Sequence, residues 1–247
     1  MSESPVRILV TGEHDDLASR CPSQLDTGRA LEWVQLPVLE FERLPVSADL
    51  VERLIQKPMN WIFFTSQRSV QFWSEVLLEN GVDFPLETQV ACIGESTAEA
   101  AARDGFNPDF YPTEPGTECF LREFEDLLSN NSQKPSFFIP MAEGGRTTIR
   151  DRLKELGCEV LSITLYRTKP RKDLGVSFSE AELAKFDLIL FTSPSSFDAF
   201  SRAFRVPGEV KVASLGRYTA QHLIRKGLSD QKQLPDGDFQ RIGELLC

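Results

Sequence analysis

Two stretches of this chain repeat each other, and this duplication constrains the fold more than any other feature of the sequence. The segment that begins Phe64-Thr-Ser reappears as Phe191-Thr-Ser, 127 positions later. A second pair, Ala91-Cys-Ile-Gly and Ala213-Ser-Leu-Gly, is offset by 122 positions. Both offsets are about half of the 247 residues. The sequence therefore predicts a duplicated unit of about half the chain.

Short apolar runs alternate with amphipathic stretches along the chain. Most runs are apolar without a polar face, which is typical of strands that are covered on both sides. Strands and helices that alternate at this length predict an α/β fold with parallel sheets. The expected strands are residues 7–11, 33–37, 61–65, 89–93, 137–139, 160–166, 188–192 and 210–215, and the expected helices are 69–79, 96–104, 147–156, 196–204 and 219–226. Glycines that follow four of these helices are expected C-caps, namely Gly81, Gly105, Gly157 and Gly227.

The expected domain boundaries follow from two further segments that match each other weakly, residues 34–40 and 160–166. A break follows each of them, at Leu44-Pro45 and at Lys169-Pro170. If the two segments run side by side as a two-strand hinge, the chain divides into a middle domain, 38–168, and a discontinuous domain made of 1–37 with 169–247. The middle domain then holds 12 Lys and Arg against 21 Asp and Glu, and the other holds 15 against 16, so the negative surplus lies almost entirely in the middle domain.

Composition excludes several classes of protein. No apolar stretch approaches the ~18 residues that a membrane span needs, and the first ten residues lack the hydrophobic region of a signal peptide, so we expect a cytoplasmic protein without a membrane partner. The five cysteines are odd in number and widely spaced, which is typical of a reducing compartment. Only two histidines occur, His14 and His222, which excludes a multi-histidine metal site. The pI of about 4.9 disfavours a nucleic-acid partner.

Hydroxyl residues and glycines gather where the expected strands end. Thr65-Ser66 and Thr192-Ser193 each lie between a strand and a helix, and Gly94 and Gly216 follow two further strands. Helix N-termini at the carboxyl ends of parallel strands present free N–H groups, so these loops favour carboxylates or phosphates. The alternative is that each hydroxyl caps its own helix. After the two Thr-Ser segments, the helices are expected to begin at Ser69 and at Ser195 or Ser196. After Gly94 and Gly216, the first turn of each helix is expected to contain Thr97 or Thr219.

Two more features are candidates for chemistry. Glu143-Gly-Gly-Arg-Thr-Thr148 is similar to the end of a phosphate-binding loop, but it lacks the upstream Gly and the Lys, so nucleoside triphosphate binding is not expected. A plain Gly-Gly turn that opens a helix explains the same residues. Tyr166 ends an apolar strand at the expected hinge, where its hydroxyl is a candidate proton donor or ligand contact. The alternative is a half-buried strand aromatic.

Seven motifs in this order and spacing resemble the uroporphyrinogen-III synthase family along nearly the whole chain. They are Leu9-Val-Thr11, Phe64-Thr-Ser66, Ile93-Gly-x-x-Thr-Ala98, Ile139-Pro-x-x-Glu-Gly-Gly-Arg146, Leu165-Tyr-Arg-Thr168, Phe191-Thr-Ser-Pro194 and Leu215-Gly-x-x-Thr-Ala220. The resemblance implies two flavodoxin-like α/β domains joined by a two-strand hinge, with a cleft between them. It also implies that hydroxymethylbilane is cyclised with loss of water and inversion of its terminal pyrrole ring, without a metal or an organic cofactor.

The same resemblance implies roles for individual residues. Tyr166 matches the cleft tyrosine of the family and is the expected catalytic residue, assisting departure of the substrate hydroxyl. The chain has Gly12 and Met141 where the family often has arginine. The expected substrate-binding residues are Thr65, Ser66, Gly94, Ser96, Thr97, Gly144, Gly145, Arg146, Thr192, Ser193, Ser195, Gly216, Tyr218 and Thr219.

Three functions remain open at this stage. The first is the cyclising synthase, a monomer that acts on a linear tetrapyrrole octacarboxylate. The second is a non-catalytic two-domain sensor of a carboxylate-rich or phosphate ligand, which closes by hinge motion. The third is a nucleotide-using enzyme on doubly wound domains.

Overall fold

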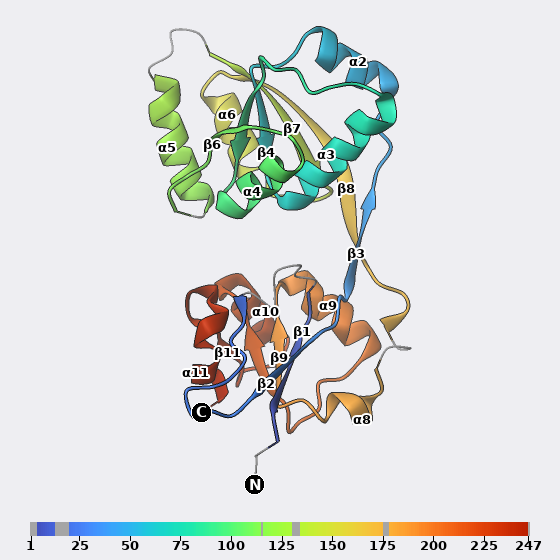
Figure 1. Ribbon diagram of the computed structural model, residues 1–247, viewed down its shortest axis with the longest axis vertical. Helices are drawn as coiled ribbons and strands as arrows, with labels where there is room; N and C mark the ends of the chain where they lie inside the picture. Colours follow the sequence, from blue (N-terminus) through green and yellow to red (C-terminus); the bar gives the residue numbers. More distant parts are fainter. Residues whose placement is uncertain (1–3, 13–19, 115, 130–133, 175–177, 247) are drawn as a thin grey trace. The chain divides into compact units, whose positions relative to one another are not determined.

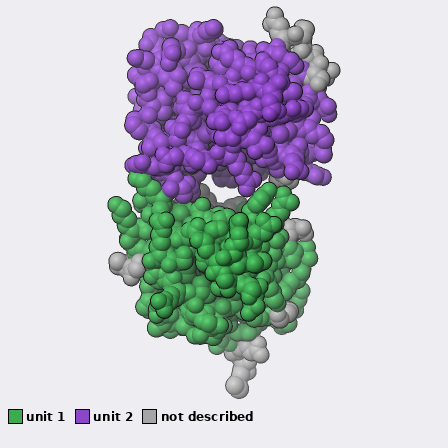
Figure 2. Space-filling view, turned by 180° about the vertical axis from the view of Figure 1, so that it is seen from behind, with its two compact units in different colours: residues 1–40, 169–247 green, residues 41–168 purple. Residues whose placement is uncertain are grey.

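A computed structural model describes residues 4–12, 20–114, 116–129, 134–174 and 178–246. The chain divides into two compact units (Figure 2). Unit 1 comprises residues 1–40 and 169–247, and unit 2 comprises residues 41–168. The sequence predicts domains that divide at 37/38 and 168/169, and the two compact units divide at 40/41 and 168/169.

Unit 1 is built on a five-stranded sheet with the order β11-β10-β9-β1-β2, and every pair in it is parallel (Figure 1). The α/β fold with parallel sheets expected from the sequence is therefore confirmed here. Among the described residues the strands are β1 (Val6–Val10), β2 (Leu31–Gln35), β9 (Leu188–Phe191), β10 (Lys211–Ser214) and β11 (Lys232–Gln233), and the helices are α8 (Glu180–Leu183), α9 (Pro194–Ala203), α10 (Arg217–Arg225) and α11 (Gly243–Leu246), with short 3-10 turns at Pro235–Gly237 and Phe239–Arg241.

Unit 2 is built on a six-stranded sheet with the order β3-β8-β7-β4-β5-β6. Its central pairs are parallel, whereas β3 runs antiparallel to β8, since Leu44 N–H donates to Leu165 O and Arg171 N–H donates to Val38 O. Its described strands are β3 (Leu39–Arg43), β4 (Trp61–Phe64), β5 (Gln89–Cys92), β6 (Pro108–Phe110), β7 (Ser136–Ala142) and β8 (Glu159–Pro170), and its described helices are α2 (Ala48–Gln56), α3 (Gln67–Asn80), α4 (Glu95–Arg103), α5 (Thr117–Ser129) and α6 (Thr148–Glu155).

The two sheets show how the duplicated sequence is distributed in space. If β7 and β8 are matched to β1 and β2, and β4, β5 and β6 to β9, β10 and β11, both units have the same strand order. That order, 2-1-3-4-5, is the flavodoxin-like one. Each unit thus combines the first two strands of one repeat with the last three strands of the other. The internal duplication and the flavodoxin-like sheets expected from the sequence are both present.

Each sheet is buried on both faces, as its apolar runs predict. In β4, Ile62 and Phe64 pack under α2, α3 and α4, whereas Trp61 and Phe63 pack under α5 and α6. In unit 1, alternate residues of β1 and β9 face two separate clusters in the same way. At ~25 cal/mol per Å² of apolar area, this burial is the main stabilising contribution to both units. None of the described helices is long and apolar enough to cross a membrane.

Helix ends follow local chemistry, and they correct two expectations. All four predicted C-cap glycines have positive φ, between 63° and 93°, which favours glycine. Only Gly81 is itself the C-cap, whereas Gly105, Gly157 and Gly227 each follow the C-cap residue of their helix. The helices after the two Thr-Ser pairs begin earlier than expected, at Gln67 and Pro194. Ser66 and Ser193 are their N-caps, and each closes a capping box with the serine three positions later.

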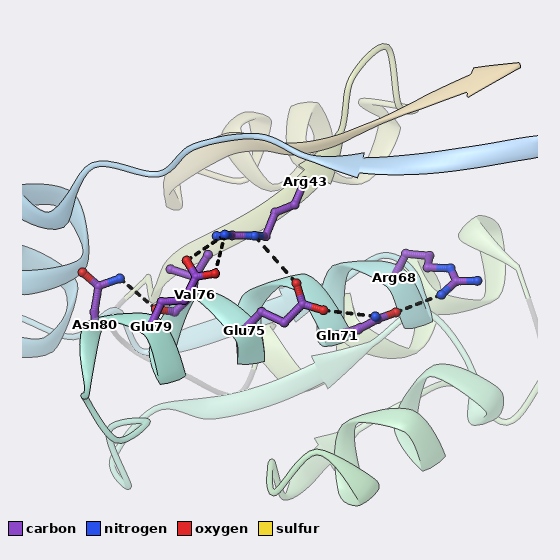
Figure 3. A network of polar contacts seen from close by, with 7 residues as sticks. All are labelled: Arg43, Arg68, Gln71, Glu75, Val76, Glu79 and Asn80. Atoms are coloured by element: carbon purple, nitrogen blue, oxygen red, sulfur yellow. Dashed lines mark hydrogen bonds and ion pairs between the residues drawn. The ribbon is translucent and has the colours of Figure 1, made fainter. Parts of the chain in front are cut away.

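The second strand of unit 1 ends earlier than expected, since the sequence predicts a strand over residues 33–37. Strand β2 ends at Gln35, because Pro37 has no N–H to donate to a ladder, and a new strand starts at Leu39. Strand β3 is fixed to α3 by Arg43, whose Nη2 lies 2.6 Å from Glu79 and whose Nε lies 3.7 Å from Glu75 (Figure 3). The network continues through Gln71 to Arg68 in the first turn of α3. Ion pairs thus hold the edge strand of unit 2 against its neighbouring helix.

Candidate functional site

A cavity of about 310 Å³ opens in unit 2 where strands β4 and β7 end. These two strands are neighbours at the point where the strand order of the sheet reverses direction, which is where open α/β sheets bind ligands. Four predicted site residues line it: Thr65, Gly145, Arg146 and Tyr166. Its other lining residues are Phe63, Ile93, Thr117, Ile139, Met141, Ala142, Thr148, Ile149 and Arg150.

Tyr166 is buried in the cavity wall, with 6% of its surface exposed. Its ring packs against Phe72 of α3 and Phe41 of β3, with centroid distances of 5.4 and 6.3 Å. Burial raises the pKa of its hydroxyl above the ordinary value of 10, although Ser66 and Arg68 act in the opposite direction. The phenol is therefore protonated at neutral pH.

Ser66 connects the tyrosine to helix α3. Its Oγ accepts the N–H of Ser69 as the N-cap of the helix and lies 2.9 Å from the hydroxyl oxygen of Tyr166. A serine hydroxyl has one proton to donate and two lone pairs to accept with. When Ser66 donates to Tyr166, the phenolic proton is left to point toward a ligand. The capping alternative raised for this residue is thus correct, and the cap also positions the candidate proton donor.

The Gly-Gly segment after β7 is a tight turn. Gly144 has a φ of 65°, and a Cβ on Gly145 would lie 3.0 Å from the carbonyl oxygen of Ala142. The turn itself therefore favours glycine at both positions, which agrees with the alternative of a plain Gly-Gly turn. The turn also brings Arg146 to the cavity. Met141, where the family often has arginine, adds an apolar wall to the same cavity.

Sequence reasoning missed three polar residues of this cavity: Thr117, Thr148 and Arg150. Thr117 begins α5, whereas Thr148 and Arg150 belong to the first turn of α6. Thr147, the N-cap of α6, makes no side-chain cap bond to the helix backbone, and its hydroxyl instead bonds the side chain of Asp151. Thr148 and Arg150 could have been found from the helix start expected at residue 147, because residues in the first turn of a helix lie beside the end of the preceding strand.

The second glycine loop of unit 2 lies at the end of β5. Gly94 is the N-cap of α4, and as a glycine it leaves the N–H groups of the first turn without a side-chain cap. Ser96 is exposed in that turn, whereas Thr97 is 3% exposed. The binding roles expected for Ser96 and Thr97 stay predictions, and the burial of Thr97 means that a ligand would meet little of its side chain.

Unit 1 carries the equivalent Thr-Ser loop after β9. The hydroxyl of Thr192 donates to Thr11 O at 3.3 Å, and Ser193 Oγ accepts the N–H of Ser196. Both hydroxyls are thus engaged inside the unit, whereas Ser195 is exposed in the first turn of α9. Through the bond from Thr192 to Thr11, this loop links the end of β9 to the end of β1.

The last predicted loop is the start of α10 in unit 1. Gly216 is an N-cap without a side-chain bond, as Gly94 is in unit 2. Tyr218 is half exposed, and its hydroxyl accepts from Arg217 Nη2 at 3.0 Å. Thr219 is 4% exposed and is thus buried like Thr97, and its binding role stays a prediction.

Of the two histidines of the sequence, His222 lies within the described residues. His222 Nε2 lies 2.9 Å from Asp198, which also pairs with Lys226, so this group ties α9 to α10. His14 lies outside the described residues. Within the described ranges no group of three or more His, Cys, Asp or Glu side chains is placed to hold a metal ion.

Comparisons with known proteins match most of the chain. The model of the family described as Uroporphyrinogen-III synthase HemD matches residues 27–233. A uroporphyrinogen-III synthase of Chlorobaculum parvum is 25% identical over 175 residues, which cover 68% of this chain and 70% of that protein. A putative uroporphyrinogen-III synthase of Methanocaldococcus jannaschii is 30% identical over 95 residues, 38% of each chain.

Two solved structures share the fold. The uroporphyrinogen-III synthetase of Helicobacter pylori superposes with a TM-score of 0.60 at 20% identity, over 92% of each chain. A mutant uroporphyrinogen III synthase of Thermus thermophilus superposes with a TM-score of 0.57 at 21% identity, over 98% of this chain and 96% of that one. The resemblance carried by the seven motifs is confirmed by the family model. This chain belongs to the uroporphyrinogen-III synthase family.

Proposed function

We propose that the protein is a cofactor-independent cyclising lyase that converts hydroxymethylbilane into uroporphyrinogen III, with inversion of the terminal pyrrole ring and loss of water. One observation carries the proposal beyond the family assignment. A buried, protonated tyrosine, Tyr166, lies in the wall of a cavity at the ligand-binding edge of the unit 2 sheet, with its hydroxyl 2.9 Å from Ser66 Oγ.

The proposed first step is loss of the substrate hydroxyl. Tyr166 donates its proton as the carbon–oxygen bond breaks, water leaves, and the cation is delocalised over the electron-rich pyrrole. A hydrogen bond donated by Ser66 stabilises the phenolate oxygen that forms. The proton is returned at ring closure, since the pyrrole carbon that forms the new bond loses its hydrogen.

The remaining contribution of the protein is to hold the chain of pyrroles in one conformation. A linear tetrapyrrole octacarboxylate needs many anion contacts, and the described helices α4, α6 and α10 each begin without a side-chain N-cap bond. Open N–H groups and the positive end of the helix dipole suit carboxylates at such ends. Binding at several carboxylates favours the conformation that leads to the spiro intermediate over direct closure.

The alternatives have less support. A non-catalytic anion sensor is not favoured, because the family model covers most of the chain and Tyr166 lies in the cavity wall. A nucleotide-using enzyme is not favoured either, because this sequence contains no phosphate-loop motif. We also propose that the protein works in the cytoplasm as a monomer. Its proposed domains are residues 1–37 with 169–247 and residues 38–168. Further backbone or hydroxyl contacts to the substrate are proposed for Ser96, Gly216, Tyr218 and Ser195.

A coupled assay tests the reaction. Hydroxymethylbilane is generated in the presence of the protein, the products are oxidised, and the porphyrin isomers are separated by chromatography. Spontaneous closure gives the symmetric type I isomer, so an excess of type III demonstrates ring inversion. Tyr166→Phe should lower kcat at least several-fold, because it removes the donor and keeps the packed ring. Type I alone from folded wild-type protein would refute the function, and an unchanged rate for the variant would remove Tyr166 from the mechanism.

A further inference from the structure

We infer that Arg150 receives a carboxylate of the substrate in the unit 2 cavity and thereby seats one acid-bearing pyrrole ring beside Tyr166. Arg150 and Tyr166 line the same cavity, Arg150 from the first turn of α6 and Tyr166 from β8. The inference rests on the proposed function, and it assigns a residue that the seven motifs do not contain.

The cavity has the size and the surfaces for such a ring. Its volume of about 310 Å³ is at the lower end of the ~300–1,000 Å³ typical of small-molecule sites, so it takes one part of a tetrapyrrole. Phe63, Ile93, Ile139, Met141 and Ile149 supply apolar walls for the aromatic ring. The acid arms then meet the polar groups on the α6 side of the cavity.

These polar groups are cationic or hydroxyl-bearing. Arg146 and Arg150 are the charged residues among the lining residues, and Thr65, Thr117 and Thr148 supply hydroxyls. A guanidinium suits a carboxylate because its parallel N–H groups can bind both oxygens. The side chain of Arg150 is 30% exposed, so its charge is partly shielded from water and acts more strongly than on an open surface.

The position of Arg150 in α6 also favours an anion nearby. A cation in the first turn of a helix is repelled by the positive end of the helix dipole, and Arg146 adds a second charge just before the helix. Asp151 offsets part of this charge, since Arg150 Nε and Nη2 each lie 2.9 Å from its Oδ1. Both contacts use one edge of the guanidinium, and across the described residues Nη1 makes no further hydrogen bond. That edge is held in place while the Nη1 donors remain for a ligand.

The test uses Arg150→Met, which removes the charge and keeps the length of the side chain, and Arg150→Lys, which keeps the charge and loses the fork. In the coupled assay we expect KM to rise at least about tenfold for Arg150→Met and less for Arg150→Lys, with a smaller change in kcat. Arg152→Met is the matched control, because Arg152 lies on the same helix but binds Glu125 of α5. Circular dichroism checks that all three variants are folded.

A binding measurement separates this inference from the proposed reaction. Uroporphyrin III, a stable octacarboxylate, is titrated into each protein and followed by quenching of tryptophan fluorescence. We expect Arg150→Met to weaken binding at least about tenfold, and Arg152→Met to leave it unchanged. Equal KM and equal affinity for Arg150→Met and wild type would overturn the inference even if type III product forms. Weakened binding without type III product would uphold Arg150 as a carboxylate contact and refute the reaction alone.

Discussion

Ser66 and Ser193 occupy equivalent positions in the two repeats, but only one of them has a tyrosine as a partner. Both accept a helix N–H in a capping box, from Ser69 at 3.1 Å and from Ser196 at 3.0 Å. Ser66 additionally bonds Tyr166, and this bond lowers the pKa of the phenol against the larger effect of burial. The duplication therefore provides an internal control for separating capping from a role in the site.

Replacing each serine by alanine should separate these two effects. Ser66→Ala and Ser193→Ala should each lower the free energy of unfolding by about 1 kcal/mol, the usual cost of losing an N-cap. Only Ser66→Ala should raise the pKa of Tyr166 further, because only it removes the hydrogen bond. Denaturant titration measures the first effect, and NMR of ¹³C-labelled tyrosine, assigned with Tyr166→Phe, measures the second. An unchanged Tyr166 pKa in Ser66→Ala would show that the hydrogen bond is not formed in solution.

On helix α5, one carboxylate fixes the preceding loop. Glu123 accepts from the backbone N–H and the hydroxyl of Thr113, at 3.1 and 2.6 Å, and from the Cys119 thiol at 3.0 Å. The Thr113 hydroxyl is the largest cause that lowers the pKa of Glu123 from 4.5 to about 2, followed by Cys119, the Thr113 backbone and Arg122. The loop from β6 thus depends on one ionised side chain.

This contact should make stability depend on pH. Because the pKa is lower in the folded protein, the contribution of Glu123 is fully present above pH 4.5 and is lost as the pH falls toward 2. Glu123→Gln should therefore be less stable than wild type at pH 7, and the difference should shrink between pH 4.5 and 2. Urea titrations at several pH values measure it, with Glu118→Gln on the same helix as the control. A difference that does not change with pH would contradict the assignment.

The elements that were predictable are those whose local chemistry decides their structure. The buried strands, the five helices and the C-cap glycines follow from apolar runs, amphipathic stretches and positive φ. Strand β3 was missed as a separate strand because Leu-Glu-Phe-Glu-Arg reads as a continuation of β2, and only its pairing with β8 shows that it joins the other sheet. Strand β6 has three residues and begins with proline, so it carries almost no local signal.

The candidate site was predictable only in part, for the same reason. Motifs that repeat or match the family lead to Thr65, Arg146 and Tyr166, whereas Arg150 is an ordinary arginine in a helical stretch until the fold places it at the cavity. The burial of Thr97 and Thr219 was also hidden, because a hydroxyl after a glycine looks the same whether it points to a ligand or to the core. Local sequence fixes the helix start, and the tertiary packing decides which face of its first turn is exposed.

For the whole molecule, the permuted duplication means that each unit completes its sheet with strands from both halves of the sequence. Unit 2 is continuous in sequence and its core is made of its own residues, while unit 1 needs both ends of the chain. Forming unit 1 closes a loop of 128 residues, from 41 to 168, and the entropy of that closure is smaller when unit 2 is already compact. We therefore expect unit 2 to stay folded when unit 1 is unfolded. We do not expect unit 1 to stay folded when unit 2 is unfolded.

Unfolding should then occur in two transitions, and the three tryptophans can report them separately. Trp33 lies in unit 1, where its indole N–H donates to Pro22 O, whereas Trp61 and Trp73 are buried in unit 2. Trp33→Phe leaves fluorescence that follows unit 2, and Trp61→Phe combined with Trp73→Phe leaves fluorescence that follows unit 1. In urea, Trp33→Phe, which reports unit 2, should show the higher midpoint. Unit 1 should unfold first or together with unit 2, because the loop that unit 1 must close costs more entropy once unit 2 is unfolded. Circular dichroism of each variant corrects for stability lost through the substitution, and coincident midpoints after that correction would mean that the two units unfold as one.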